Sequence, residues 1–147
     1  MKLTSTLISL ATLFSIAYAD IQPVRPNSFY DNPDTPMNDV ACSDGANGLA
    51  AKYPTFGSLP GFPYIGGAYA VTGWNSTECG SCWQLTYTET GVTVYYTAID
   101  TVFSGFDVSD QTMNTLTNGQ TGEFTLIDVY ATAVTESNCF PVQREQK

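Results

Sequence analysis

The most regular pattern in the chain lies near its C-terminal end, where residues 122–134 alternate between two faces. One face would carry Thr125, Ile127, Val129, Ala131 and Ala133, and the other Phe124, Leu126, Asp128, Tyr130 and Thr132. A period of two is that of a strand that buries one face. The pattern therefore predicts a strand over residues 122–134.

Other segments predict further strands. Residues 83–88 and 92–99 are rich in β-branched and aromatic side chains, and the Glu89-Thr90-Gly91 segment between them is typical of a hairpin connection. Residues 55–73 are rich in Gly, Pro and aromatics, which indicates a loop with a short strand near residues 68–71. Residues 20–40 contain four prolines and are expected to be extended, with an edge strand around residues 28–30.

Two segments predict short helices. Asn47 would cap a helix over residues 48–53, which Pro54 would end, and Ser109 would cap a helix over residues 110–116, which Asn118 and Gly119 would stop. Several strands and two or three short helices predict a mainly β fold, a small barrel or sandwich. No internal repeat or second domain is visible.

The first nineteen residues are predicted to be a signal peptide. Lys2 precedes an apolar run over residues 7–17, and Ala17-Tyr18-Ala19 is a small-x-small cleavage signature. The run is shorter than the roughly 20 apolar residues that a membrane span needs. Cleavage before Asp20 would leave one domain, residues 20–147, whose polar tail at residues 143–147 is expected to fray.

Charge excludes several classes of function. The 147 residues include 14 Asp and Glu, 5 Lys and Arg and no His, for a net charge of −9. Without histidine there is no Ser-His-Asp triad, no Cys-His dyad and no usual zinc site, and an acidic chain repels nucleic acid. The chemistry that remains belongs to carboxylates and tyrosines, and neither a metal nor another cofactor is expected.

An even number of cysteines in an exported chain indicates disulfides. The spacing leaves open two pairings, Cys42 with Cys79 and Cys82 with Cys139, or Cys42 with Cys82 and Cys79 with Cys139. A redox role for the Cys79-Gly80-Ser81-Cys82 segment is disfavoured because no βαβ pattern surrounds it. The same segment followed by Trp83 satisfies a papain-type nucleophile signature, which the lack of histidine rejects.

A series of short motifs carries a family resemblance. In chain order they are Tyr30-Asp31, Cys42-Ser43-Asp44-Gly45, Tyr53-Pro54-Thr55, Pro60-Gly61-Phe62-Pro63, Gly66-Gly67, Gly73-Trp74, Cys79-Gly80-Ser81-Cys82-Trp83, Asp100 with Gly105-Phe106, and Ser137-Asn138-Cys139. In order and spacing they resemble the cerato-platanin family of small secreted fungal proteins, over nearly all of the mature chain.

The resemblance implies a double-psi β-barrel, akin to the N-terminal domain of expansins, with disulfides Cys42–Cys79 and Cys82–Cys139. It also implies a secreted cell-wall protein that binds chitin-type N-acetylglucosamine oligomers, loosens cellulosic material without clear hydrolysis and elicits plant defence. Some members of the family self-assemble at interfaces.

Asp100 is the leading candidate for chemistry, because it follows the predicted strand 92–99 and precedes a glycine-containing loop. The resemblance places it where expansins and related glucanases have an Asp that serves the glucanases as general acid. Glycoside hydrolysis needs a second carboxylate at a defined distance. Asp31, Asp44 and Asp107 are candidates for this second carboxylate, but nothing in the sequence brings them close to Asp100. For Asp107, as for Asp128, a surface or capping role is favoured.

Sugar binding without catalysis does not require a second carboxylate. It requires a shallow groove with hydrogen-bonding groups and an aromatic face. The candidate binding residues are Asp100, Asp44, Asp31 and Tyr30. Trp83 is expected in the core, whereas Tyr30 and Trp74 are expected to be more open. Asn75-Ser76-Thr77 is a formal N-glycosylation sequon.

Three hypotheses follow from these residues. The preferred one is a non-catalytic cell-wall protein that binds chitin-type oligomers, because only one carboxylate is clearly placed. The alternatives are a weak β-glycan hydrolase that uses Asp100, and a surface-active protein that self-associates. The sequence thus favours a binder over an enzyme.

Overall fold

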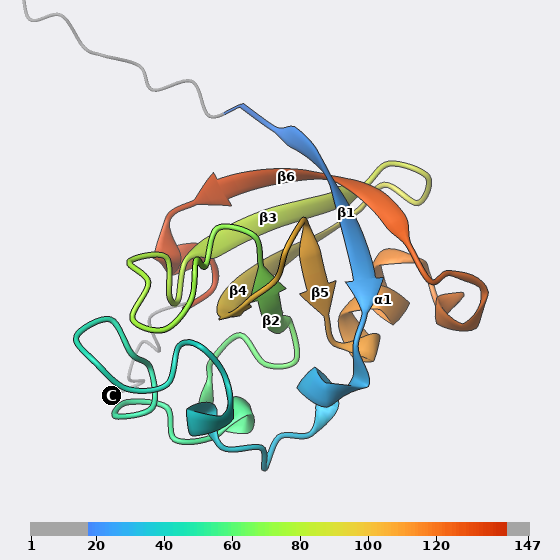
Figure 1. Ribbon diagram of the computed structural model, residues 1–147. Coiled ribbons are helices and arrows are strands. Elements are labelled where there is room, and N and C mark those ends of the chain that lie inside the picture. The colour runs from blue at the N-terminus through green and yellow to red at the C-terminus, as the bar shows by residue number, and fades with distance from the viewer. Residues whose placement is uncertain (1–17, 141–147) are drawn as a thin grey trace, which may run out of the picture.

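The computed structural model describes residues 18–140, which form a closed six-stranded barrel (Figure 1). The strands are β1 (Asp20–Pro26), β2 (Ile65–Ala68), β3 (Cys82–Tyr87), β4 (Val92–Thr101), β5 (Phe106–Val108) and β6 (Ile127–Val134). Around the barrel their order is β1-β5-β2-β4-β3-β6. The β1–β5 and β2–β4 pairs are parallel and the others are antiparallel. The expected mainly β barrel is confirmed, and closure leaves no open sheet edge in it.

One α-helix, α1 (Asp110–Leu116), packs against this barrel. It has the predicted bounds, because the Ser109 hydroxyl accepts the N–H of Thr112 at 3.0 Å and so caps the first turn. Short 3-10 turns complete the described elements: η1 (Ser28–Asp31), η2 (Met37–Asp39), η3 (Phe56–Ser58), η4 (Thr121–Glu123) and η5 (Glu136–Asn138).

The predicted helix over residues 48–53 is wrong. The backbone N–H groups of Leu49 and Ala50 bond back to the carbonyls of Cys42 and Ser43 instead of starting a helix. The side chain of Asn47, the expected cap, donates to the carbonyl of Asn75 at 2.9 Å. Lys52 and Tyr53 both donate to the carbonyl of Leu49, so a single turn closes there and no helix propagates.

Three strand predictions also need correction. Residues 28–30 lie in η1, where Asn27 caps the turn by accepting the N–H of Phe29, and the strand precedes them as β1. The short strand expected near residues 68–71 is β2 at Ile65–Ala68. The last strand begins at Ile127 because residues 121–123 form η4, although Ile127, Val129 and Ala131 are buried as the alternation predicted. β5 has three residues and was not predicted.

Two apolar clusters form the core. The interior of the barrel holds Tyr96, Phe106, Leu85 and their neighbours, with Trp83 buried as expected. A second cluster fills the space between the barrel and the long segment that joins β1 to β2, drawn in blue to green in Figure 1. Ile65 and Ile99 belong to this second cluster, so it rests on the outer side of β2 and β4. The long segment therefore covers one side of the barrel.

The disulfides join Cys42 to Cys79 and Cys82 to Cys139, as the family resemblance implied. The first bond ties the covering segment to the loop before β3, and the second ties β3 to the end of the described chain. Apart from its last two residues, the predicted signal peptide lies outside the described residues, as does the tail. Within residues 18–140 no helix is long and apolar enough to cross a membrane.

Candidate functional site at the Asp100 row

Four neighbouring strands place a row of charged residues and one glycine side by side. Arg25 of β1 is in register with Asp107 of β5, which pairs with Gly67 of β2, which in turn pairs with Asp100 of β4. Residues that pair across a sheet point to the same side of it. We call these four residues, Arg25, Asp107, Gly67 and Asp100, the Asp100 row. Two strand spacings of about 4.8 Å each separate the backbones of its two carboxylates.

Three donors converge on the Asp100 carboxylate. Its Oδ1 accepts the backbone N–H of Ala41 at 3.0 Å and that of Thr101 at 2.8 Å, and its Oδ2 accepts the hydroxyl of Tyr30 at 3.1 Å. The Asp100 side chain is half-buried at the end of β4. An ionised carboxylate has about four acceptor positions, so one is left for an external donor.

Tyr30 holds Asp100 from the covered side of the barrel. It was expected to be open, but only 3% of its surface is exposed, and its ring packs against Phe29 and Phe56. Burial, and next the charge of Asp100, raise the pKa of Tyr30 far above its usual range. Tyr30 therefore stays a neutral hydrogen-bond donor and orients Asp100, rather than offering an aromatic face to a sugar.

Gly67 makes room for this contact. A side-chain carbon at Gly67 would collide with Val102 and would lie 3.3 Å from the hydroxyl oxygen of Tyr30. The Tyr96 hydroxyl, inside the barrel, also donates to the carbonyl of Gly67 at 3.0 Å. The glycine is thus needed mainly because Val102 packs against it, beside the hydroxyl of Tyr30.

The structure places Asp107 in the Asp100 row, and the sequence pattern did not predict this position. Burial, and to a smaller extent the charge of Asp100, raise the pKa of the Asp107 carboxyl, while Arg25 at 4.0 Å opposes the shift. Arg25 also donates to the carbonyl of Ser104 at 3.2 Å. No signal in the sequence could have found this arrangement, because it depends on β5, a strand too short to show a pattern.

The other predicted binding residues lie in different surroundings. Asp31 accepts the N–H groups of Asp110 at 2.8 Å and Gln111 at 3.1 Å, so it caps α1. Asp44 accepts the indole N–H of Trp74 at 2.6 Å, and Trp74 is exposed as expected. Neither acid has a described contact with the Asp100 row.

The sequon residue Asn75 has a local structural role. Its side-chain oxygen accepts the N–H of Asn47 at 2.9 Å, and its backbone has a positive φ of 59°. Its glycosylation stays a prediction. The described residues contain no group of three or more His, Cys, Asp or Glu side chains that could hold a metal ion.

Exposed aromatic side chains lie near the row. Phe103, in the loop between β4 and β5, is fully exposed three residues after Asp100. Tyr69 directly follows β2, is partly exposed, and its N–H donates to the carbonyl of Gly105 at 2.9 Å, at the end of the same loop. The parallel strands β2 and β4 therefore bring two aromatic rings to the end of the barrel that holds Asp100.

Comparison with known proteins agrees with the fold and the motifs. The sequence profile of the family described as cerato-platanin matches residues 23–142. The chain is 47% identical over 110 residues to Allergen Asp f 15 of Aspergillus fumigatus, which covers 75% of this chain and 71% of that protein. It is 39% identical over 106 residues to cerato-platanin of Ceratocystis fimbriata f. sp. platani, over 72% of this chain and 78% of that protein.

Solved structures give the same result. The crystal structure of cerato-platanin 2 from M. perniciosa superposes with a TM-score of 0.79 at 43% identity, over 82% of this chain and 98% of that chain. The solution structure of the fungal elicitor cerato-platanin superposes with a TM-score of 0.71 at 34% identity, over 80% of this chain and 95% of that chain. The profile, the cysteine pairing and the barrel agree, and the chain belongs to the cerato-platanin family.

Proposed function

We propose that the protein is a secreted fungal cell-wall protein that binds chitin-type N-acetylglucosamine oligomers at the Asp100 row and does not cleave them. The observation that carries this proposal is the Asp100 carboxylate, which three donors hold at the partly open end of β4. Such a carboxylate is fixed in direction before a ligand arrives, which lowers the entropy that binding costs.

The chemistry of the row supports an amino sugar. Asp100 and Asp107 can still accept hydrogen bonds from a ligand. An N-acetylglucosamine unit carries suitable donors, namely its hydroxyls and its acetamido N–H. The exposed rings of Phe103 and Tyr69 offer apolar faces for the C–H side of a pyranose. A neutral sugar also avoids the repulsion that an anionic polymer would meet on a chain of net charge −9.

A titration followed by two-dimensional NMR tests the proposal. With N-acetylglucosamine trimer at millimolar concentration, the amides of residues 100–105 and of Tyr69 are expected to shift. Asp100→Asn should abolish these shifts, and Asp128→Asn, at an exposed carboxylate of β6, should leave them unchanged. Unchanged spectra of the unaltered protein at tens of millimolar sugar would contradict the proposal.

The family relation extends the proposal to biological activity. One similar structure is described as that of a fungal elicitor and one similar protein as an allergen. We propose that this chain also elicits plant defence and loosens cellulosic material, and that both effects depend on the Asp100 row. Infiltration of leaves and a filter-paper loosening assay with the Asp100→Asn and Asp128→Asn variants would test that dependence, since equal activity of the two variants would refute it.

Hydrolysis is the second candidate function, favoured by one observation. Asp107 has a raised pKa and faces Asp100 across Gly67, so Asp107 could protonate a glycosidic oxygen while Asp100 accepts a proton from water. Release of reducing ends from chitin oligomers that either Asp100→Asn or Asp107→Asn abolishes would favour hydrolysis. Binding without release would favour the non-catalytic reading.

A further inference from the structure

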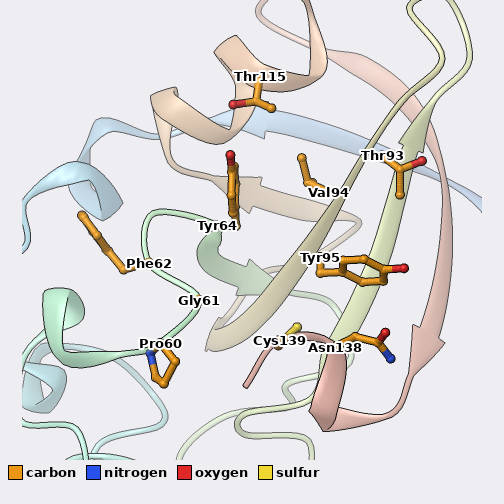
Figure 2. A pocket seen from close by; sticks show the side chains of 10 residues that line it. All are labelled: Pro60, Gly61, Phe62, Tyr64, Thr93, Val94, Tyr95, Thr115, Asn138 and Cys139. Atoms are coloured by element: carbon orange, nitrogen blue, oxygen red, sulfur yellow. The ribbon is translucent and has the colours of Figure 1, made fainter. Parts of the chain in front are cut away.

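A pocket on the outer wall of β4 lies apart from the Asp100 row. Its volume is about 350 Å³, within the range of small-molecule sites. Figure 2 shows Thr93 and Tyr95 of β4 on one side of it, and Tyr64, Phe62 and Thr115 on the other. Along β4, Thr93, Tyr95 and Thr97 share the outer face, because side chains of a strand alternate. Asp100 lies farther along β4, beyond the register shift between the Gly66–Ala98 and Gly67–Asp100 pairs.

The lining of this outer pocket excludes charged ligands. It contains no Asp, Glu, Lys or Arg, although the chain as a whole has a net charge of −9. An anion would find no cation there, and a cation would find no carboxylate. An added peptide strand is excluded as well, because the barrel next to the pocket is closed and has no free edge.

The lining instead combines rings with neutral polar groups. Tyr95 is 42% exposed, so much of its ring is free to contact a ligand. Asn138 donates its amide N–H to Thr135, which leaves its side-chain oxygen as an acceptor, and the Thr115 hydroxyl donates to the carbonyl of Gln111 and so keeps its acceptor sites. A ligand ring with an apolar face and hydroxyl donors at its rim would match both the exposed ring of Tyr95 and these free acceptor atoms.

An unpaired hydroxyl lies behind the same pocket. Thr97 is fully buried, and its Oγ1 has no hydrogen-bond partner among the described residues. Gly61, which lines the pocket, covers it so closely that a side-chain carbon at Gly61 would lie 3.0 Å from that oxygen. Buried polar atoms are nearly always paired, so this hydroxyl is expected to bond to a buried water behind Gly61; a ligand in the pocket does not contact it, because Thr97 is not part of the lining.

We propose that the outer pocket is a second carbohydrate site, which takes one neutral pyranose ring against Tyr95. The choice of a wall sugar as ligand rests on the proposed function, but the site itself is separate. Tyr95 and Asp100 are five residues apart on one strand, so up to about 17 Å of extended backbone separates the two sites. Two such sites would let one molecule hold two glycan chains, with a gain in avidity that neither site supplies alone.

The same NMR titration, with N-acetylglucosamine dimer and with cellobiose, separates the two sites. We expect the amides of Thr93, Tyr95 and Asn138 to shift with at least one sugar, and to do so also in Asp100→Asn. Tyr95→Ala should weaken binding at the pocket at least tenfold and leave the shifts of residues 100–105 unchanged. Tyr130→Ala is the matched control, because Tyr130 of β6 is 44% exposed but does not line the pocket.

Two other outcomes overturn the inference, and one overturns only the proposed function. If residues 100–105 shift and the pocket residues do not, the second site is absent while the proposed function stands. If only the pocket shifts, the proposed function fails and the second site stands. If the pocket amides shift with protein concentration in the absence of sugar, and sugar does not reverse this, the occupant is a second copy of the chain.

Discussion

Replacement of Asp100 by alanine tests the central claim that this carboxylate is held by the fold. The change removes the acceptor of three donors, the N–H groups of Ala41 and Thr101 and the hydroxyl of Tyr30. Thr101 is exposed, so its N–H can bond to water at little cost. The other two donors are partly or fully shielded, and each left unpaired costs about 1–3 kcal/mol.

We therefore expect Asp100→Ala to lower the free energy of unfolding by about 2–6 kcal/mol. For a domain of this length, that loss corresponds to a fall in Tm of roughly 8–24 °C. Urea unfolding followed by tryptophan fluorescence, with both disulfides intact, measures the free energy directly. Asp100→Asn keeps an oxygen that the two N–H groups can still use, so it should cost less than half as much and is the right variant for binding experiments.

A double-mutant cycle isolates the bond to the tyrosine. Tyr30→Phe removes the hydroxyl, so Asp100→Ala in that background leaves one fewer unpaired donor and should cost less than in the unaltered protein. Asp128→Ala is the control, with an expected effect within about 0.5 kcal/mol because its side chain is exposed. An effect of Asp100→Ala as small as that of the control would refute the claim that the fold holds this carboxylate.

Three further changes test other parts of the structure. Asp31→Ala removes the acceptor of the first two N–H groups of α1, leaves the Ser109 cap in place and should cost about 1–2 kcal/mol in urea unfolding, with a null effect arguing against this role. Gly105→Ala should cost more than about 1 kcal/mol, because its φ is 65° and the new carbon would meet the carbonyl of Pro23, and an unchanged Tm would contradict this. Asp107→Asn should stabilise the protein at neutral pH. Burial, and then the charge of Asp100, raise the pKa of Asp107, so the Asp107 carboxyl binds its proton more tightly in the folded state than in the unfolded state. The free energy of unfolding of the unaltered protein therefore falls as the pH rises through the range above 3.8. The gain from Asp107→Asn should therefore vanish below pH 3.8, and a gain that persists there in thermal melts would exclude this explanation.

Local sequence patterns were sufficient to predict the helix and strands whose own residues strongly favour that structure. Ser109 and the residues after it specify α1 through a cap, and the dense β-branched runs specify β3 and β4, so these elements were found within one or two residues. The alternation after residue 126 also identified the buried face of β6. In such segments the local preference and the tertiary structure agree, which is why the sequence alone is sufficient.

Other elements exist only because of distant partners. Residues 48–53 have helical composition, but the N–H groups of Leu49 and Ala50 bond to residues 42 and 43, and the Asn47 side chain bonds to Asn75 instead of capping a helix. β2 contains two glycines and β5 has three residues, so neither shows a period, and both are strands because their neighbours in the barrel supply the hydrogen bonds. Tertiary pairing overrides weak local preference in each case.

The sequence by itself determined the family motifs, the number of cysteines, the absence of histidine and the candidacy of Asp100. Only the tertiary structure decided what surrounds Asp100. It buried Tyr30 to orient the carboxylate, assigned Asp31 to a helix cap, and aligned Asp107 with Asp100 across Gly67. The reason is that a carboxylate acquires its role from donors and charges that lie far away in the chain, and the closed barrel together with the segment that covers it brings those groups together.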